Sequence, residues 1–440
     1  MSPEELEQKL IQCTRCGTCL KDCPVYKETL DEQYTARAKI NLVKAIYFHD
    51  RMKLDNDLRD IAEMCLLCKS CQTACPNNVD GPEFTLFLRE QIVGRFGQSG
   101  IKRTIFNSLL PKPGLLGFFA RLAAFGQALS LDRVAGAVTG RNLRKIIDYA
   151  PKVSARSFSA IHPAGTVLAP LGGGQPKARV AYFYGCVTNL VTPPVGQATV
   201  DVLRRNGYEV VIPAQSCCGV PASANGDFAA ATQMAGDNIN SFLKAGFDWV
   251  IADCASCSST LKEYGQLLGH DQAKAFAAKV RDINEFLVAE GYDRDGLGEV
   301  RLTVTYHDPC HLKRYQNIAA QPRAILKSIP GVTFKEMKEA DKCCGASGSF
   351  VLTHHDISLR IGDKKGQNAL ATGADAVVTG CPSCRMQIAN ATRRAGRELP
   401  VHHPVELLAW AYAAKSAGAR RAAQNISEGT VQNRAVAGGK

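Results

Sequence analysis

The chain has 440 residues, 45% of them hydrophobic and 21% charged, which indicates a globular protein of two or three domains and excludes a disordered or fibrous one. Lysine and arginine (53) outnumber aspartate and glutamate (41), and the net charge of +12 favours an anionic partner without identifying it. No run of about 20 apolar residues occurs, which excludes a membrane-spanning helix. The acidic, polar start at 1–10 carries no secretory signal, so we expect a cytoplasmic protein.

All 18 cysteines fall into four groups, which are the most informative feature of the chain. In a reducing compartment cysteines rarely form disulfides, so groups of them indicate metal binding or redox chemistry. The first and second runs are Cys13, Cys16, Cys19 and Cys23, and Cys65, Cys68, Cys71 and Cys75. The first and second CCG sets, named for their Cys-Cys-Gly triplets, are Cys186, Cys217, Cys218, Cys254 and Cys257, and Cys310, Cys343, Cys344, Cys381 and Cys384.

Residues 1–96 hold both runs and are expected to form a small helical domain. Each run reads C-x2-C-x2-C-x3-C-P. Three thiolates on a tight loop converge on one face of a cubic iron–sulfur cluster, and the fourth, on the following helical turn, points toward the neighbouring cluster. The spacing therefore predicts two [4Fe-4S] clusters. The first ligand set is Cys13, Cys16, Cys19 and Cys75, and the second ligand set is Cys65, Cys68, Cys71 and Cys23.

Zinc is the alternative for each run, because four cysteines can close a tetrahedral site. Zinc motifs usually pair two C-x2-C knuckles at a distance, however, whereas each run places three cysteines within seven residues. The runs resemble those of bacterial two-cluster ferredoxins, with a helical insertion at 34–64 between them. The same arrangement is found in succinate-dehydrogenase-type and heterodisulfide-reductase-type subunits.

Residues 97–177 form a basic linker without cysteine, which we expect to be helical. Between Arg95 and Ala160 there are 11 basic residues against two acidic ones, a local charge of +9. Such a segment suits docking on an acidic partner or on an anionic lipid surface. The alternative is a solvated helical cover that packs on the domains after it.

The two CCG sets belong to a duplicated unit, because matching cysteines are 124 to 127 residues apart. We expect the units at 178–300 and 301–412, followed by a disordered tail at 413–440. Strand and helix patterns alternate in each unit, which favours parallel βαβ units with the cysteines at the carboxyl ends of strands. The expected strands are 178–184, 208–212, 248–252, 301–306, 332–334 and 376–379, and the expected helices are 197–206, 227–244, 323–328 and 357–371.

The CCG sets read C-x30-CCG-x34-C-x2-C and C-x32-CCG-x35-C-x2-C. Five cysteines are one more than a cubic cluster or a zinc site needs. The pattern resembles the CCG domain of heterodisulfide reductase and of the iron–sulfur subunits of glycolate oxidase, lactate utilisation and anaerobic glycerol-3-phosphate dehydrogenase. That resemblance implies an additional, non-cubane iron–sulfur cluster in one or both domains. A structural zinc or partly unmetallated cysteines are the alternatives.

Six histidines accompany the second CCG set in the sequence. Such histidines more often form local hydrogen bonds or cap helices, and the alternative is that they tune a cluster or move a proton. They are His307, His311, His354, His355, His402 and His403.

The sequence holds no dinucleotide-binding G-x-G-x-x-G after a strand, no P-loop, and no Ser–His–Asp arrangement to which catalysis is assigned. Nothing indicates nucleic-acid binding. We assign no catalytic residue and no cofactor-binding residue beyond the cysteines. A relay of metal clusters does not by itself oxidise an organic substrate, so the two-electron chemistry is expected on a flavin held by another polypeptide.

Residues 10–412 are similar to the glycolate oxidase iron–sulfur subunit family, including the phrases HDPCHLKRYQ, CCGASGSF and GCPSC. The resemblance implies a multidomain α+β fold, with a helical two-[4Fe-4S] ferredoxin domain followed by duplicated α/β CCG domains. It implies an electron-transfer subunit of an oxidoreductase acting on CH–OH donors, whose FAD-binding partner oxidises glycolate or D-lactate. Electrons then pass to quinone or another carrier, with peripheral contact at the cytoplasmic face of the inner membrane. The rival functions are a heterodisulfide-reductase-like thiol–disulfide reductase, an iron–sulfur component of anaerobic glycerol-3-phosphate dehydrogenase and a zinc-stabilised scaffold.

Overall fold

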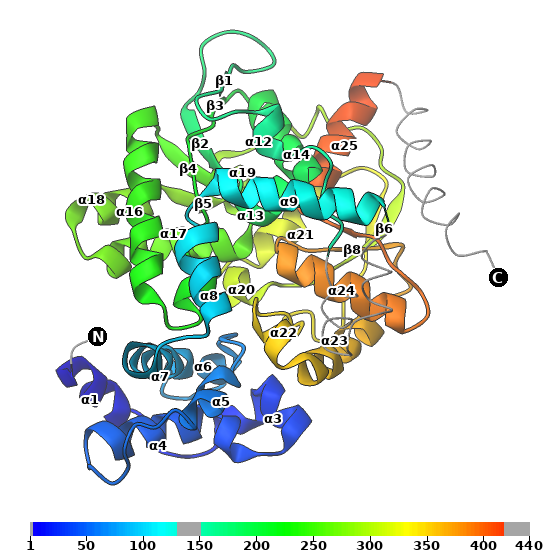
Figure 1. Cartoon of the computed structure of the whole chain (residues 1–440). Helices are drawn as coiled ribbons and strands as arrows, with labels where there is room; N and C mark the ends of the chain where they lie inside the picture. The colour runs from blue at the N-terminus through cyan, green and yellow to red at the C-terminus, as the bar shows by residue number, and fades with distance from the viewer. Residues whose placement is uncertain (1–2, 130–150, 418–440) are drawn as a thin grey trace.

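A computed structural model of the chain describes residues 3–129 and 151–417 (Figure 1). A helical N-terminal region, blue at the bottom of the figure, lies beneath two units that each contain a β-sheet. Among the described helices, none combines the length and apolar character that a membrane crossing requires.

The N-terminal region consists of short helices around a small apolar core. Val43, Phe84 and Leu88 are almost fully buried in this core, which joins α4 to α7. Pro24 and Pro82 lie in the first turns of α3 and α7, where a missing N–H leaves no helical hydrogen bond unmade. The elements are α1 (Pro3–Ile11), α2 (Thr18–Asp22), α3 (Pro24–Thr29), η1 (Glu32–Tyr34), α4 (Ala36–Tyr47), α5 (Leu58–Glu63), α6 (Ser70–Thr73) and α7 (Gly81–Phe96).

The linker begins as a cover on the first sheet unit. Phe106 and Leu110 are buried in the core of that unit, and the Leu110 carbonyl accepts a hydrogen bond from the Cys217 N–H (3.3 Å). By contrast, α9 buries none of its side chains. The elements are α8 (Gly100–Thr104), the π-helical turn η2 (Ile105–Leu109), α9 (Pro113–Ala128) and α12 (Phe158–Ile161). The basic residues Arg141, Arg144 and Lys145 lie outside the described residues.

The first sheet unit contains five strands in the order β1-β3-β2-β4-β5. All neighbours are parallel except β1, which pairs antiparallel with β3. The strands are β1 (Val167–Leu168), β2 (Arg179–Phe183), β3 (Glu209–Val211), β4 (Trp249–Ala252) and β5 (Val280–Asp282). The helices are α13 (Cys186–Leu190), α14 (Pro193–Arg205), α15 (Val220–Ser223), α16 (Phe228–Ala245), α17 (Ala255–Leu268), α18 (Asp271–Ala278) and α19 (Ile283–Glu290).

The second sheet unit repeats this plan with four parallel strands in the order β7-β6-β8-β9. The strands are β6 (Leu302–Tyr306), β7 (Val332–Phe334), β8 (Ala376–Val378) and β9 (Val401–His402). The helices are α20 (Cys310–Gln316), α21 (Ala320–Ser328), α22 (Phe350–Thr353), α23 (His355–Leu370), α24 (Pro382–Arg394) and α25 (Pro404–Ala417). The expected α/β architecture with parallel strands is therefore confirmed.

The two sheet units share one apolar core, so they pack against each other and do not form independent domains. Val180 and Val200 of the first unit and Val304 and Leu407 of the second belong to the same buried cluster. Helix α25 packs against α14 of the first unit.

The two largest differences between element boundaries and the sequence-based expectation are at the start of α14 and the end of α25. Helix α14 begins at Pro193 rather than at 197, because two prolines fit the first helical turn, a stretch for which we expect a loop from the sequence. Helix α25 continues to Ala417, beyond the expected start of the tail at 413. The continuation is explained by buried Ala414 and by the Gly298 N–H, which donates to the Ala411 carbonyl (2.8 Å).

Candidate metal centres

The structure brings the predicted first and second ligand sets into two adjoining pockets. Cys75 lies with the first three cysteines of the first run, and Cys23 lies with those of the second run. Cys71 lines both pockets and marks the place where they meet. The fourth cysteine of each run therefore lies beside the other run, as the spacing predicts. That these residues bind clusters stays a proposal.

The two runs have the same backbone winding. Arg15 and Gly17 have positive φ values of 60° and 82°, and Leu67 and Lys69 at the matching positions have 51° and 56°. A left-handed residue between successive cysteines turns their sulfurs toward one point. For a residue with a Cβ this conformation costs about 1–2 kcal/mol. The loops adopt it at Arg15, Leu67 and Lys69, so a group that binds the converging sulfurs would offset this strain.

The start of α7 approaches the sulfurs closely. A Cβ added to Gly81 would lie 2.9 Å from the Cys71 Sγ and 2.6 Å from the Ala36 Cβ. Only glycine leaves room here for the backbone to pass the sulfur that both pockets share. Together with the all-thiol donor set, this cradle fits iron–sulfur clusters in the two pockets.

Backbone N–H groups also donate to sulfur atoms, as they do around iron–sulfur clusters. The donor and acceptor pairs are Tyr26 N to Cys23 Sγ (3.5 Å), Leu67 N to Cys65 Sγ (3.4 Å) and Gly345 N to Cys343 Sγ (3.4 Å). These bonds stabilise the thiolate form that a metal requires.

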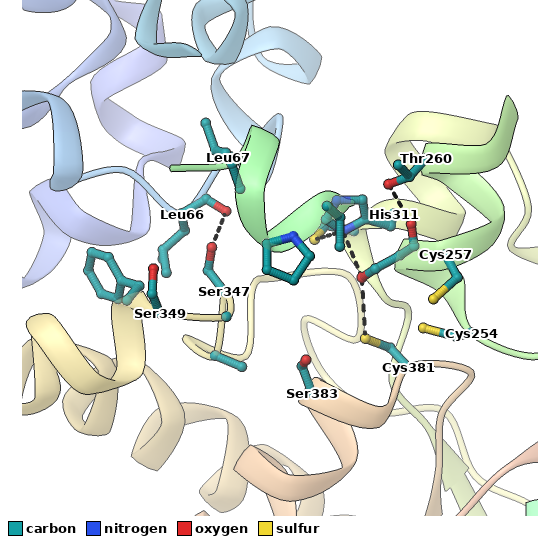
Figure 2. Close-up of a pocket in the computed structure, with 18 of the residues that line it drawn as sticks. Leu66, Leu67, Cys254, Cys257, Thr260, His311, Ser347, Ser349, Cys381 and Ser383 are labelled. Atoms are coloured by element: carbon teal, nitrogen blue, oxygen red, sulfur yellow. Dashed lines mark hydrogen bonds between the residues drawn. The ribbon is translucent and has the colours of Figure 1, made fainter. Parts of the chain in front are cut away.

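All ten cysteines of the two CCG sets line one cavity of about 210 Å³ between the sheet units. Figure 2 shows part of this cavity, with Cys254, Cys257 and Cys381 labelled. Strands β2, β4, β6 and β8 all end at this cavity, and a cysteine follows each of them within a few residues. Cys254 and Cys381 are the N-caps of α17 and α24, where the positive end of the helix dipole favours thiolate. The N-terminal region closes one side of the cavity with Leu66 and Leu67.

Within each CCG set the sulfurs are close enough to influence one another. Cys344 Sγ and Cys384 Sγ share a hydrogen bond of 3.2 Å, and contact with Cys343 and Cys384 lowers the pKa of Cys344 well below its usual value. Contacts with Cys217 and Cys257 lower the pKa of Cys218 to about 6. Each set therefore holds at least one thiol that ionises more readily than its buried neighbours, and an all-sulfur donor set of this kind suits a soft metal.

The second ligand set lies against the second CCG set. The Cys68 thiol contacts the Cys343 thiol, and this contact lowers the pKa of Cys68 to about 6. The Tyr315 hydroxyl donates to the Leu67 carbonyl at 2.7 Å, and the Ser347 hydroxyl donates to the Leu66 carbonyl at 3.0 Å. These bonds fix the loop of the second run on the second sheet unit.

Ion pairs tie α2 and α3 to the same sheet unit. Lys342 pairs with Asp22, and Arg360 and Lys364 both pair with Glu28, at 3.3 and 2.5 Å. Exposed pairs of this kind contribute little singly, and here they add to an apolar contact in which Phe350 packs near Cys68.

Four of the six histidines have local roles, as expected for the more common case. His355 Nδ1 bonds the Val351 carbonyl, and His403 Nδ1 accepts from the Val405 N–H, each at 3.1 Å. His354 lies 3.4 Å from Asp60, and His402 packs against Trp410. His307 and His311 instead line the cavity of the CCG sets.

Several residues that shape these centres have no signal in the sequence. Gly81 has no motif around it, and the phrase HDPCHLKRYQ contains Tyr315 without indicating what Tyr315 contacts. The roles of both residues depend on docking between segments far apart in the chain. Ser256, whose hydroxyl lies 3.8 Å from Cys381 Sγ, belongs to the first unit but contacts the second CCG set.

Comparisons with known proteins agree with this architecture. The family "4Fe-4S dicluster domain" matches residues 9–79, and the "Cysteine-rich domain" (CCG) family matches residues 180–262 and 304–389. The fold and its cysteine sets thus define an iron–sulfur protein with several clusters.

Full-length relatives narrow the class further. The chain is 31% identical to the probable glycolate oxidase iron–sulfur subunit of Bacillus subtilis, over 89% of this chain and 90% of that protein. It is 27% identical to the glycolate oxidase iron–sulfur subunit of Escherichia coli and to a CoB–CoM heterodisulfide reductase subunit of Methanosarcina acetivorans, each over 92% of this chain and 94% of the relative. The chain belongs to the glycolate oxidase iron–sulfur subunit family.

Proposed function

We propose that the chain is the electron-transfer subunit of a flavin-dependent 2-hydroxy-acid dehydrogenase that oxidises glycolate or D-lactate. The observation that carries this proposal is the unbroken series of cysteine sets from the surface to the interior. All eighteen cysteines lie in the described ranges, and Cys16 of the first ligand set is the exposed one. Cys71 connects the first pocket to the second, and Cys68 connects the second to the CCG cavity.

Iron–sulfur clusters, when bound, accept and release electrons singly, which lets a two-electron flavin serve a one-electron carrier. The cysteines of this chain hold the series in order, and the burial of its inner members excludes water from them. Cys217, Cys218 and Cys344 are each no more than 3% exposed. We assign bond making and breaking on the hydroxy acid to the FAD-binding partner.

Helix α9 is proposed to lie on an anionic membrane surface near the quinone pool. Its exposed large apolar side chains are Leu115, Phe118, Phe119, Leu122 and Phe125, followed by Leu129 just after the helix. The stretch from Gly97 to Leu129 contains four basic residues and no acidic one. An apolar helix face beside positive charge is the pattern of an interfacial helix, and its preference for anionic lipid supports the cytoplasmic side of the membrane as its location.

A thiol–disulfide reductase is the second candidate. It is favoured by the fact that both five-cysteine CCG sets are complete and open on one shared cavity. Reduction of disulfide substrates by the purified chain with a reduced viologen dye, without any flavoprotein, would establish it.

The decisive experiment is copurification with the FAD-binding subunit followed by dye-linked assays. Glycolate, D-lactate, L-lactate and glycerol 3-phosphate are tested in parallel with the complex and with the flavoprotein alone. We expect the complex to pass electrons from glycolate or D-lactate to a quinone analogue, and the flavoprotein alone to fail at that last step. Equal quinone reduction by the flavoprotein alone would contradict the proposal.

A further inference from the structure

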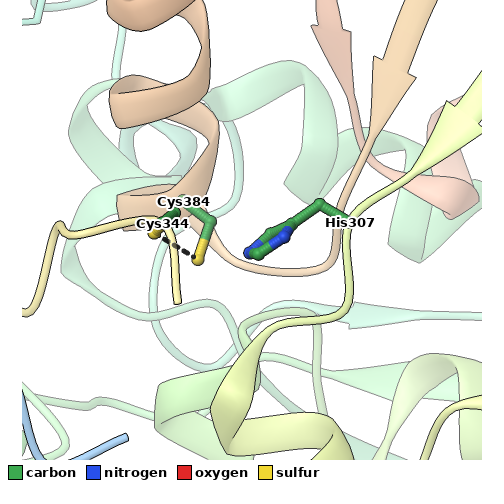
Figure 3. Close-up of side chains that lie close together, drawn as sticks. All are labelled: His307, Cys344 and Cys384. Atoms are coloured by element: carbon green, nitrogen blue, oxygen red, sulfur yellow. Dashed lines mark hydrogen bonds between the residues drawn. The ribbon is translucent and has the colours of Figure 1, made fainter. Parts of the chain in front are cut away.

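His307 points its imidazole at two cysteines of the second CCG set (Figure 3). A ring nitrogen of His307 and the Sγ atoms of Cys344 and Cys384 all lie within 4.8 Å of one another. All three residues are buried, and His307 is 1% exposed. It follows β6 directly, so the sheet fixes where its side chain begins.

The hydrogen bond of Nδ1 determines where the proton of His307 sits. Nδ1 lies 3.0 Å from the Ala340 carbonyl oxygen, which can only accept, so Nδ1 carries the hydrogen and donates it. Ala340 is held in place because its carbonyl also accepts from the Asp308 N–H (3.1 Å). Nε2 is therefore left with a lone pair.

Among the described residues that lone pair makes no hydrogen bond of normal geometry, and the group that it faces is the sulfur of Cys344. A buried polar atom without a partner costs on the order of 1–3 kcal/mol, so its persistence calls for a ligand. Histidines that bind metals characteristically donate their other ring N–H to a backbone carbonyl, which fixes the tautomer and aims the free nitrogen. His307 has the same arrangement, with Nδ1 bonded to the Ala340 carbonyl and Nε2 free to bind a metal.

The first CCG set has no equivalent nitrogen at the matching position of its strand. Tyr184 follows β2 as His307 follows β6, but its ring packs in the apolar core, with its centroid 5.0 Å from that of Phe158. Tyr184 is not among the described residues that line the cavity. The duplicated units therefore differ in the atom that they present at this position.

We propose that His307 Nε2 is an iron ligand in the second CCG set, which makes this site mixed nitrogen and sulfur while the first is sulfur only. The inference rests on the proposed iron–sulfur occupancy of the second CCG set. Nε2 supplies its lone pair, and no proton is released because Nδ1 keeps its hydrogen. Because five cysteines are one more than a cubic cluster needs, Nε2 takes the place of one thiolate as ligand. A neutral imidazole in place of a thiolate raises the reduction potential of an iron–sulfur site, so the second CCG set has the higher potential of the two.

The test uses the full chain, purified without oxygen after growth with ¹⁵N-labelled histidine. Electron–nuclear double resonance on the signal of the second CCG set should show a directly bound ¹⁵N nucleus. His307→Ala should abolish this coupling, and His307→Cys should restore the ligand count while shifting the reduction potential to a lower value. His402→Gln, which removes a half-buried imidazole outside the cavity, should leave the coupling and the potential unchanged.

The wild-type measurement keeps the inference testable even where a His307 variant fails to fold. Iron in the second CCG set without any nitrogen coupling would overturn the inference and leave the proposed function intact. Iron missing from that set, or zinc in its place, would overturn both.

Discussion

The Cys68 thiol of the second run contacts the Cys343 thiol of the second CCG set, and this contact joins the N-terminal region to the sheet units. The neighbouring hydrogen bonds from Tyr315 and Ser347 hold the loop of the second run at the cavity wall. Electron transfer weakens steeply with distance, so this direct sulfur contact lies on the route that we propose for electrons between the two regions. The exposed Cys16 lies at the other end of this route.

We expect Cys16→Ser to abolish electron flow from substrate to quinone in the assembled complex while the flavin of the partner is still reduced by substrate. The reason is that Cys16 belongs to the outermost ligand set, through which the series meets another protein. Stopped-flow absorbance of the flavin and a quinone-reduction assay measure the two steps separately. Thr14→Ser, a change in the same loop that removes no sulfur, serves as the control. Persistent quinone reduction in Cys16→Ser would show that the route is wrong.

Replacing Cys343 and Cys344 together with serine should remove one distinct signal from the electron paramagnetic resonance spectrum of the reduced protein. Both sulfurs lie in the second CCG set, and contact with Cys343 and Cys384 lowers the pKa of Cys344. The matched control is the double replacement of Cys217 and Cys218, which should remove a different signal. An identical spectrum for wild type and the Cys343/Cys344 variant would count against a cluster there.

Gly81→Ala should lower the iron content and destabilise the N-terminal region, because the new methyl group collides with Cys71 Sγ and Ala36. Overpacking of this kind costs about 1–3 kcal/mol. The control is Gly94→Ala in the same helix, where nothing lies within 4 Å of the added carbon. That change should raise stability by about 0.5–1 kcal/mol. Iron-to-protein ratios and urea unfolding midpoints measure both effects. The same iron content and the same midpoint in both variants would show that the cluster pockets do not require glycine at position 81.

Phe118→Glu combined with Phe125→Glu should weaken binding to vesicles containing anionic lipid. Burial of one such ring contributes about 1.5–3 kcal/mol, so the double change should reduce affinity by about 100-fold or more. Cosedimentation with anionic and neutral vesicles at low and high salt measures this. Leu171→Glu, at an exposed apolar residue elsewhere in the linker, should bind like wild type.

Charge reversal at Arg141, Arg144 and Lys145 should weaken the same binding, each lost positive charge removing about 1 kcal/mol of attraction to the lipid surface. Cosedimentation with the same vesicles is the measurement. Binding that is unaffected by the phenylalanine changes and by the charge reversals would make the segment a plain cover.

Local features of this molecule can be predicted from the sequence better than their assembly. The spacing of the runs predicts that Cys75 joins the first three cysteines of the first run and that Cys23 joins those of the second run. The fold places both cysteines in this way. The alternation of strand and helix patterns predicts the parallel strands, because a parallel strand that is buried on both faces consists of a continuous apolar run. The helix start at Pro193 escapes prediction, since a proline can either break a helix or open one, and only the neighbouring residues decide.

Assembly depends on contacts that local patterns do not encode. The shared cavity exists because α25 and α14 dock the sheet units together. The lone pair of His307 is aimed by a carbonyl at Ala340, distant from it in the sequence. No residue near His307 in the sequence carries that information.

The wall formed by Leu66 and Leu67 has a consequence for biogenesis. Once these residues sit over the cavity, they stand between the ten sulfurs behind them and a scaffold protein that delivers iron from that side. Maturation should therefore proceed from the inside outward, with the CCG sets loaded before the N-terminal region closes. Ribosomal synthesis makes the N-terminal region first, so we expect this region to stay undocked until the CCG sets have received their metal.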